Sequence, residues 1–382
     1  MGKDQRLNFI DGARGTAMFF VFLSHFVEKY LTRFETPYGP LLSTVAMIAT
    51  PTFMAISGLM LGYIYQSARN FPNFRAKLID RGLFMLTAGH ILIAFTHIPK
   101  SDSLQDAMYR WQFITDAIGF CILVGPFLVC RIKPTGRIAF ALLIYSFSWL
   151  AIFYFHPHSW ILRFLKEISV GTLDRDVLYF AFPFLPWLGF YLINTCIGEK
   201  IAVYQRNNEP KKISRTFLAL GSTFLLLVLI VKFGHKILQA NPWFSFTGIP
   251  YVLVSPYQKL PPSPIYLFAF GSMSYFILFF LFWLRDWRAT KEFVRVSSIL
   301  GRTSLFVFII QYYVYYLVLW SLNLPYSPFW PIYLIGSAGF IVGVSYVWER
   351  RHLNELLTLG TGRFWKNYLS NRTIRQMALR KE

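Results

Sequence analysis

The chain has 382 residues, of which 55% are hydrophobic, 19% aromatic and only 15% charged, and its mean hydropathy is +0.44. A soluble domain of this length needs more charged residues to cover its surface, so the composition excludes an ordinary soluble protein. The formal net charge of +20 could indicate a nucleic-acid-binding protein. The distribution of the cations, described below, argues against that class.

Apolar stretches long enough to cross the hydrocarbon core of a bilayer recur along the chain. No stretch alternates at period two between turn signals, which favours helices over a β-barrel. We therefore predict an all-α, polytopic integral membrane protein with about ten transmembrane helices. The predicted spans are 9–31, 41–65, 78–98, 112–130, 138–155, 178–198, 214–232, 264–284, 303–321 and 328–348.

The first apolar stretch is predicted to be a transmembrane helix and not a signal peptide. It contains Asp11 and Arg14, lacks a small-residue cleavage site and leads directly into further spans. No linker or soluble appendage interrupts the later spans. We expect a single transmembrane domain over 1–349, followed by a basic cytoplasmic tail over 350–382.

The positions of the cations predict the orientation of the chain. With the N-terminus in the cytoplasm, the inner segments hold 27 of the 38 Lys and Arg residues. This asymmetry follows the positive-inside rule at nearly every loop, so both termini are expected in the cytoplasm. Because topology explains most of the basic excess, we do not expect nucleic acid as a partner.

The three cysteines fall within predicted spans or at their ends. Cys121, Cys130 and Cys196 have no metal-ligand spacing, so they are interpreted as packing residues. No metal site is expected.

Arg14 and His25 are ionisable residues within the first predicted span, where each is a site hypothesis. They lie eleven positions apart, so both project from one helical face with a rise of about 16 Å between them. Alternatively, Asp11 and Arg14 form an i,i+3 pair that anchors the helix, and His25 is a packing residue. Gly12 and Gly15 could admit a neighbouring helix or a ligand.

The second predicted span combines Pro51 with Ser57 and Gly58. Proline removes a backbone donor, and the small residues permit close approach of a neighbour. This pattern is typical either of a kink beside a cavity or of an ordinary packing kink.

A cluster of cations, Arg75, Lys77 and Arg81, precedes the core of the third predicted span. It could hold phosphate groups by charge-assisted hydrogen bonds, or it could enforce topology and bind anionic headgroups. His90, nine residues after Arg81 and so on roughly the opposite face, is interpreted as a packing residue. Asp116, near the outer end of the fourth span, must face a partner or water and could orient an imidazole.

Several of these segments resemble a known superfamily. Phe9-Ile-Asp-Gly-Ala-Arg14-Gly-Thr-Ala, followed by His25, resembles the signature of the transmembrane acyltransferases of acyltransferase family 3, as does Phe53-Met-Ala-Ile-Ser-Gly58. Other segments are similar to the heparan-α-glucosaminide N-acetyltransferase-like group of the same superfamily. These are Pro51-Thr-Phe, Ile114-Thr-Asp-Ala-Ile-Gly-Phe and Phe182-Pro-Phe-Leu-Pro-Trp-Leu-Gly189, and Leu300-Gly-Arg-Thr-Ser-Leu-Phe-Val-Phe resembles a shared helix start.

The resemblance implies acyl transfer from acyl-CoA, usually acetyl-CoA, to a hydroxyl or amine of a carbohydrate or glycolipid. His25 would be the catalytic imidazole, either as general base or as transient acyl acceptor, and Arg14 would belong to the acyl-CoA tunnel. The small residues at Ser57 and Gly58 would line the donor site, with Arg75, Lys77 and Arg81 facing the nucleotide phosphates. Apart from the resemblance, Asp116 could polarise His25, so it is a further candidate catalytic residue. The membrane would be a bacterial inner membrane, and the acceptor an envelope or surface glycan.

Two positions depart from the family pattern. Asp116 stands where the sister group often has an amide, and Gln311 stands where the late helix often has histidine, so further catalytic partners cannot be transferred to this chain. Two rival hypotheses remain open. One is a transporter or flippase for a lipid-linked sugar or small solute, in which Arg, Asp and His form a relay. The other is a purely structural or partner-binding membrane protein.

Overall fold

The computed structural model describes residues 8–68, 70–240, 251–284 and 291–366. Within these ranges the chain consists of α-helices with short 3-10 and π-helical segments, and it contains no strand. Among the described residues, seven helices are long and apolar enough to cross a membrane, or eight if one bent pair counts as a single span. The predicted all-α, polytopic membrane class is therefore confirmed.

The chain divides into two compact units, which interleave along the sequence. Unit 1 comprises Met1–Ile56 and Asn208–Asn354, and unit 2 comprises Ser57–Asn207 and Glu355–Glu382. Helix α3 belongs to both, because the boundary falls within it.

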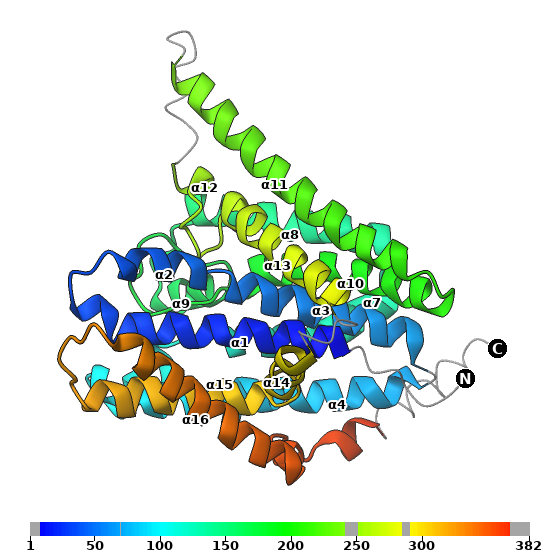
Figure 1. Cartoon of the computed structure of the whole chain (residues 1–382). Helices are drawn as coiled ribbons and strands as arrows, with labels where there is room; N and C mark the ends of the chain where they lie inside the picture. Colours follow the sequence, from blue (N-terminus) through cyan, green and yellow to red (C-terminus); the bar gives the residue numbers. More distant parts are fainter. Residues whose placement is uncertain (1–7, 69, 241–250, 285–290, 367–382) are drawn as a thin grey trace. The chain divides into compact units, whose positions relative to one another are not determined.

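Unit 1 is built around α1, which packs against most of the other helices of that unit (Figure 1). Its elements are α1 (Asn8–Lys29), η1 (Leu31–Arg33), α2 (Tyr38–Ala46), the start of α3 (Ala49–Ser67), α11 (Pro210–Ala240), α12 (Tyr251–Val254), α13 (Pro264–Leu284), α14 (Lys291–Arg302), α15 (Ser304–Tyr312), η5 (Tyr313–Leu319), α16 (Trp330–Arg350) and the start of η6 (Leu353–Leu356).

Helix α14 crosses α1 in the N-terminal part of α1, and glycine residues in both helices allow the two backbones to approach closely. A Cβ atom on Gly15 would lie 1.6 Å from the carbonyl oxygen of Ser297, and one on Gly301 would lie 1.9 Å from that of Asp11. Each helix thus places a glycine directly against the backbone of the other helix. The prediction that Gly15 admits a neighbouring helix is confirmed.

Unit 2 holds the rest of α3 and the helices that follow it. These are α4 (Phe71–Phe84), η2 (Met85–Gly89), α5 (His90–Ala94), η3 (Phe95–Lys100), α6 (Leu104–Tyr109), α7 (Ile114–Arg131), α8 (Pro134–Tyr154), α9 (Trp160–Ser169) and α10 (Phe184–Arg206). In this unit α7 packs against α4 and α10, and α8 packs against α10.

The predicted spans match the helices in place, with three differences in shape. The second span consists of two helices, α2 and α3, and the third contains the π-helical segment η2. The ninth is preceded by α14, which is bent by 80° against α15 and η5.

The sixth predicted span begins six residues too early, because α10 begins only at Phe184. The backbone nitrogens of Val177 and Leu178 donate to the carboxylate of Glu167, and that of Tyr179 donates to the carbonyl of Arg110. These bonds hold the segment outside the helix.

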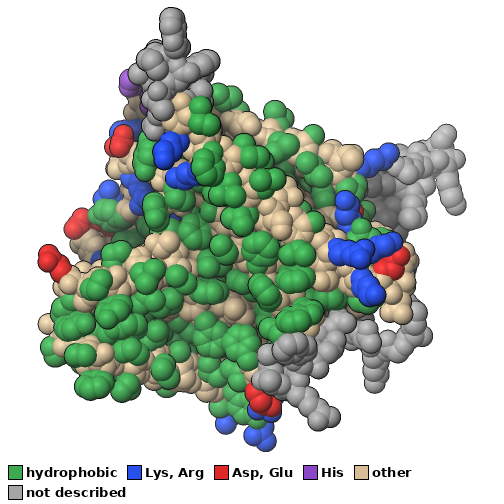
Figure 2. All heavy atoms as spheres, turned by 45° about the horizontal axis from the view of Figure 1, so that its top comes forward, with side chains coloured by type: hydrophobic (Ala, Val, Ile, Leu, Met, Phe, Trp, Pro, Cys, Tyr) green, Lys and Arg blue, Asp and Glu red, His purple; other side chains and the backbone are tan. Residues whose placement is uncertain are grey.

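Hydrophobic side chains are exposed along whole helices in each unit, and they dominate the surface in Figure 2. In unit 1 they include Leu226, Ile230 and Phe233 on α11, and in unit 2 they include Leu143 and Phe147 on α8. Such faces are unfavourable in water and favourable against acyl chains, so these helices are expected to contact lipid.

Candidate functional site

Arg14 lies toward the N-terminal end of α1, beside the close crossing with α14. Its Nη1 donates a hydrogen bond of 3.3 Å to the carbonyl oxygen of Gly301 and lies 3.7 Å from Oδ1 of Asp11. The i,i+3 pair proposed from the sequence is therefore confirmed. About a fifth of the Arg14 side chain is exposed, at 21%, so the guanidinium is anchored without being closed off.

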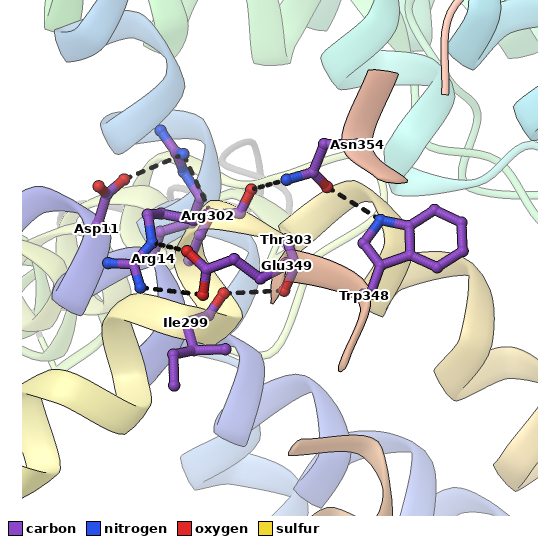
Figure 3. Close-up of polar contacts among 9 residues, drawn as sticks. Asp11, Arg14, Ile299, Arg302, Thr303, Trp348, Glu349 and Asn354 are labelled. Atoms are coloured by element: carbon purple, nitrogen blue, oxygen red, sulfur yellow. Dashed lines mark hydrogen bonds and ion pairs between the residues drawn. The ribbon is translucent and has the colours of Figure 1, made fainter. Parts of the chain in front are cut away.

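A second guanidinium, that of Arg302, lies next to this crossing at the end of α14 (Figure 3). It makes a two-point contact with the carboxylate of Glu349, in which Nη2 lies 3.0 Å from Oε2. Asn354 donates to the carbonyl of Arg302, and Trp348 donates to the side chain of Asn354. These contacts tie the α14–α15 bend to α16.

No sequence pattern singles out Arg302 beyond its place among the cations of the predicted inner segments. The segment from Leu300 to Phe308 signalled a helix start, and α15 does begin within it, at Ser304. The partner Glu349 is 47 residues away, so only the fold identifies the pair.

His25 lies toward the C-terminal end of α1 and belongs to a polar network. Its Nδ1 is 3.0 Å from Oη of Tyr316, and that hydroxyl donates a hydrogen bond of 2.7 Å to Oε2 of Glu28. The aromatic ring of Tyr312 also contacts the imidazole, with centroids 4.9 Å apart. Only 14% of the His25 side chain is exposed.

Two cations complete the surroundings of His25. The Nζ of Lys29 contacts Oε1 of Glu28 and lies 3.9 Å from the centroid of the Tyr316 ring. Lys259, in the segment between α12 and α13, is close enough to interact electrostatically with both His25 and Glu28. Burial lowers the pKa of Lys259 to about 8, and the charge of Glu28 acts in the opposite direction.

Sequence reasoning missed Glu28, Tyr312 and Tyr316. A signal for Glu28 existed, because a residue three positions after His25 shares its helical face. The two tyrosines lie four residues apart in α15 and η5, yet nothing in the sequence shows that these segments pack on α1.

Asp116, in unit 2, is paired with an imidazole, which is one of the alternatives that the sequence left open for it. Its Oδ2 lies 2.9 Å from Nδ1 of His90 and accepts a hydrogen bond of 2.7 Å from the backbone nitrogen of Phe113. The Nε2 of His90 lies 2.9 Å from the carbonyl of Met108. The pair joins α7 to α5, and the catalytic role of Asp116 remains a prediction.

The three cations of α4 do not share a face. Arg75 points toward α7, where its guanidinium lies 5.5 Å from the Phe127 ring and within hydrogen-bond distance of the Cys130 sulfur. Lys77 and Arg81 are exposed and lie four residues apart, so they share the other face. The cluster expected from the sequence is thus a pair and a separate, half-buried arginine.

Gly58 lies against α10, and its neighbourhood leaves no room for a side chain. A Cβ atom there would be 2.3 Å from the carbonyl oxygen of Tyr191. Gly62, one turn later, is equally close to Thr195, and Gly198 of α10 is close to Leu59 in return. Close packing of helices accounts for Gly58; the part predicted for Ser57 and Gly58 in donor binding remains a prediction.

The described residues contain no group of three or more His, Cys, Asp or Glu side chains that could hold a metal ion. The three cysteines are free thiols, two of them buried.

The model of the protein family described as heparan-alpha-glucosaminide N-acetyltransferase, catalytic, matches residues 6–233, which is more than half of the chain. The chain belongs to this family. A second family model, described as OpgC protein, matches residues 193–353. No curated protein matches the chain significantly.

The two matches cover different parts of the network around His25. Arg14, His25 and Glu28 lie within the N-acetyltransferase match, and Tyr316 lies within the OpgC match. Membership of the first family confirms the resemblance to the heparan-α-glucosaminide N-acetyltransferase-like group. The likeness of residues 9–25 to acyltransferase family 3 remains a resemblance. The family matches support a membrane acyltransferase-like activity for this chain.

Proposed function

We propose that this protein moves an acyl group, in the simplest case acetyl, from cytoplasmic acyl-CoA to a hydroxyl group of an envelope or surface carbohydrate. The observation that carries the proposal is the placement of Arg14 and His25 on one face of α1, within the region that matches the N-acetyltransferase family. An amine acceptor is the less favoured version. The predicted location is a bacterial inner membrane.

The orientation predicted from the cations gives each residue a role. CoA is anionic and cytoplasmic, so its phosphates would meet cations that the predicted orientation places on the inner side of the membrane. The slender pantetheine arm would then extend along α1 toward His25, over a rise of about 16 Å. The thioester would end in the outer half of the membrane, beside the acceptor.

His25 supplies the acid–base chemistry of this proposal. As general base, it takes the proton of the acceptor hydroxyl while that oxygen attacks the thioester carbon. The carbon–sulfur bond breaks, and the departing thiolate takes a proton from the imidazolium, which restores neutral His25 and gives free CoA. If His25 instead accepts the acyl group, the imidazole attacks the thioester carbon, the carbon–sulfur bond breaks and CoA leaves as the thiolate, which takes up a proton. The acceptor oxygen then attacks the acyl-imidazole, the carbon–nitrogen bond breaks, and the acceptor proton goes to the departing imidazole.

The direct experiment measures acetyl transfer from radiolabelled acetyl-CoA by purified protein in detergent, where no gradient exists. A His25→Ala variant should lose activity by about 100-fold or more, since general acid–base groups contribute rate factors of that size. His158→Ala, at an exposed histidine, is the matched control and should retain activity.

Two outcomes would contradict the proposal. Full activity in a His25→Ala protein that elutes and melts like the wild type would remove the assignment of His25. Gradient-driven uptake of a sugar into sealed vesicles, without thioester cleavage in detergent, would favour the rival transporter hypothesis.

A further inference from the structure

The hydrogen bonds in the network around His25 determine which nitrogen of its imidazole carries the proton. The carboxylate of Glu28 is the starting point of this network. Half of the Glu28 side chain is exposed, at 49%, and the ammonium of Lys29 contacts it. Both conditions favour the ionised form, and an ionised carboxylate can only accept hydrogen bonds.

Tyr316 comes next. Its hydroxyl has a single hydrogen, which the 2.7 Å bond directs to Oε2 of Glu28. The same oxygen lies 3.0 Å from Nδ1 of His25. Since the only phenolic hydrogen is already used, the oxygen must accept in this second bond, and Nδ1 must donate.

A neutral imidazole has one N–H group, so a proton on Nδ1 leaves Nε2 with a free lone pair. We infer that Glu28 and Tyr316 are positioning residues, which hold His25 in the Nδ1–H tautomer and make Nε2 the nitrogen that takes the acceptor proton. This inference rests on the proposed acyl transfer for its use, but the tautomer can be tested without it.

The other groups around His25 are compatible with this assignment. Lys29 and Lys259 are cations that cannot accept a proton from Nδ1, and the ring of Tyr312 contacts the imidazole by its face or edge. Lys29 binds Glu28 on one side and lies against the Tyr316 ring on the other. Lys29 therefore helps to hold Glu28 and Tyr316 in place, and these two residues in turn position the imidazole of His25.

The arrangement also supports the imidazolium formed during transfer. When Nε2 takes the acceptor proton, Nδ1 keeps its own, so the bond to Tyr316 persists and no group has to reorient. The negative charge of Glu28, 3.7 Å from Nδ1, then faces a positive ring. Electrostatic stabilisation of a charge that develops only in the transition state raises kcat and leaves substrate affinity unchanged.

The tautomer can be read from nitrogen chemical shifts of protein labelled with ¹⁵N-histidine, with His25→Gln used to assign the signals. In the wild type we expect His25 as Nδ1–H. In Tyr316→Phe the bond is lost, and the ring should shift toward the Nε2–H form. Tyr315→Phe is the matched control, because that hydroxyl bonds to Ser337 and should leave the His25 signals unchanged.

Kinetics provide the second readout. Tyr316→Phe should lower kcat by about 10- to 100-fold with an unchanged KM for acyl-CoA. Glu28→Gln keeps an acceptor oxygen but removes the charge. The imidazolium then loses a negative neighbour, so the acidic limb of the pH–rate profile should move to lower pH.

Two results would overturn the inference: a wild-type His25 in the Nε2–H form, or a tautomer that Tyr316→Phe leaves unchanged. Neither would affect the His25→Ala test of acyl transfer. Conversely, an Nδ1–H tautomer in a protein without transferase activity would support the hydrogen-bond assignment and contradict the proposed function.

Discussion

Gly15 of α1 faces the backbone of Ser297 in α14 so closely that the two helices meet without an intervening side chain. The contact is reciprocal, because Gly301 of α14 lies equally close to the backbone of Asp11. It places the carbonyl of Gly301 within reach of Arg14. The position of Arg14 in the candidate site thus depends on two glycines that belong to different helices.

Replacement of Gly15 by alanine should therefore destabilise the protein strongly. The new Cβ atom would meet a backbone carbonyl, which cannot move aside like a flexible side chain. Overpacking typically costs about 1–3 kcal/mol and occasionally more, and we expect the upper end of this range here. Gly336→Ala in α16 is the control, because a Cβ atom there meets nothing within 4 Å. Thermal melting in detergent should show a lower transition for Gly15→Ala only; equal melting of both variants would contradict the close crossing.

The helices could be predicted from the sequence because runs of apolar residues define them, but their breaks could not. The bend between α14 and α15 is held by Arg302 and Glu349, whose partnership is not local. The segment before α10 stays outside the helix because Glu167 binds its backbone nitrogens. A hydropathy profile contains no information about either of these interactions.

The candidate site was predictable only where its residues share one helix. The spacing of Arg14 and His25 identified a common face, and the same argument applied to Glu28 would have found it. Tyr316 comes from a helix whose packing against α1 no local pattern reveals. For Arg75, Lys77 and Arg81, nearness in sequence suggested a cluster, whereas a helical-wheel argument separates Arg75 from the other two.

The buried pair of Asp116 and His90 should contribute to stability as a unit. Asp116→Ala leaves Nδ1 of His90 without its acceptor, and removal of one partner of a buried ion pair costs about 3–5 kcal/mol. His90→Ala should cost a similar amount, and the double variant should cost clearly less than the sum. Asp174→Ala, at an exposed carboxylate, is the control.

The same variants test the catalytic role predicted for Asp116. Melting curves give the coupling, and transferase activity is measured per amount of folded protein. If Asp116→Ala melts like the wild type and loses only activity, its main role is in catalysis and the stabilising role argued above is wrong.

Lys77 and Arg81 are expected to bind the CoA nucleotide, and Arg75 is not. A charge-assisted hydrogen bond to phosphate contributes about 1.5 kcal/mol or more, so Lys77→Gln or Arg81→Gln should raise the KM for acetyl-CoA roughly 10-fold. Arg75→Gln should leave KM unchanged and lower the melting temperature, because Arg75 packs against Phe127. The acetyl thioester of dephospho-CoA tests which phosphate of CoA the two cations bind. A variant that lacks the cation for the missing phosphate should have the same KM for this thioester as for acetyl-CoA. An unchanged KM in both single variants would contradict the assignment.

Lys259 gives the protein a pH-dependent stability with a defined sign. Its pKa is about 8 in the folded protein, because burial disfavours the ammonium, and 10.5 is its ordinary value. Between these values the unfolded chain binds more protons than the folded one, so the free energy of unfolding should rise with pH across this window. Below pH 8 both states are protonated, and the full cost of the buried charge is present.

Lys259→Met removes that cost, so the variant should melt a few degrees higher than the wild type at pH 7. The difference should shrink as the pH rises from about 8 to 10.5. Lys232→Met, at an exposed lysine, should follow the wild type throughout. A Lys259→Met protein that melts lower at pH 7 would show that the ammonium stabilises Glu28 by more than its burial costs, which would make Lys259 a necessary part of the network that positions His25.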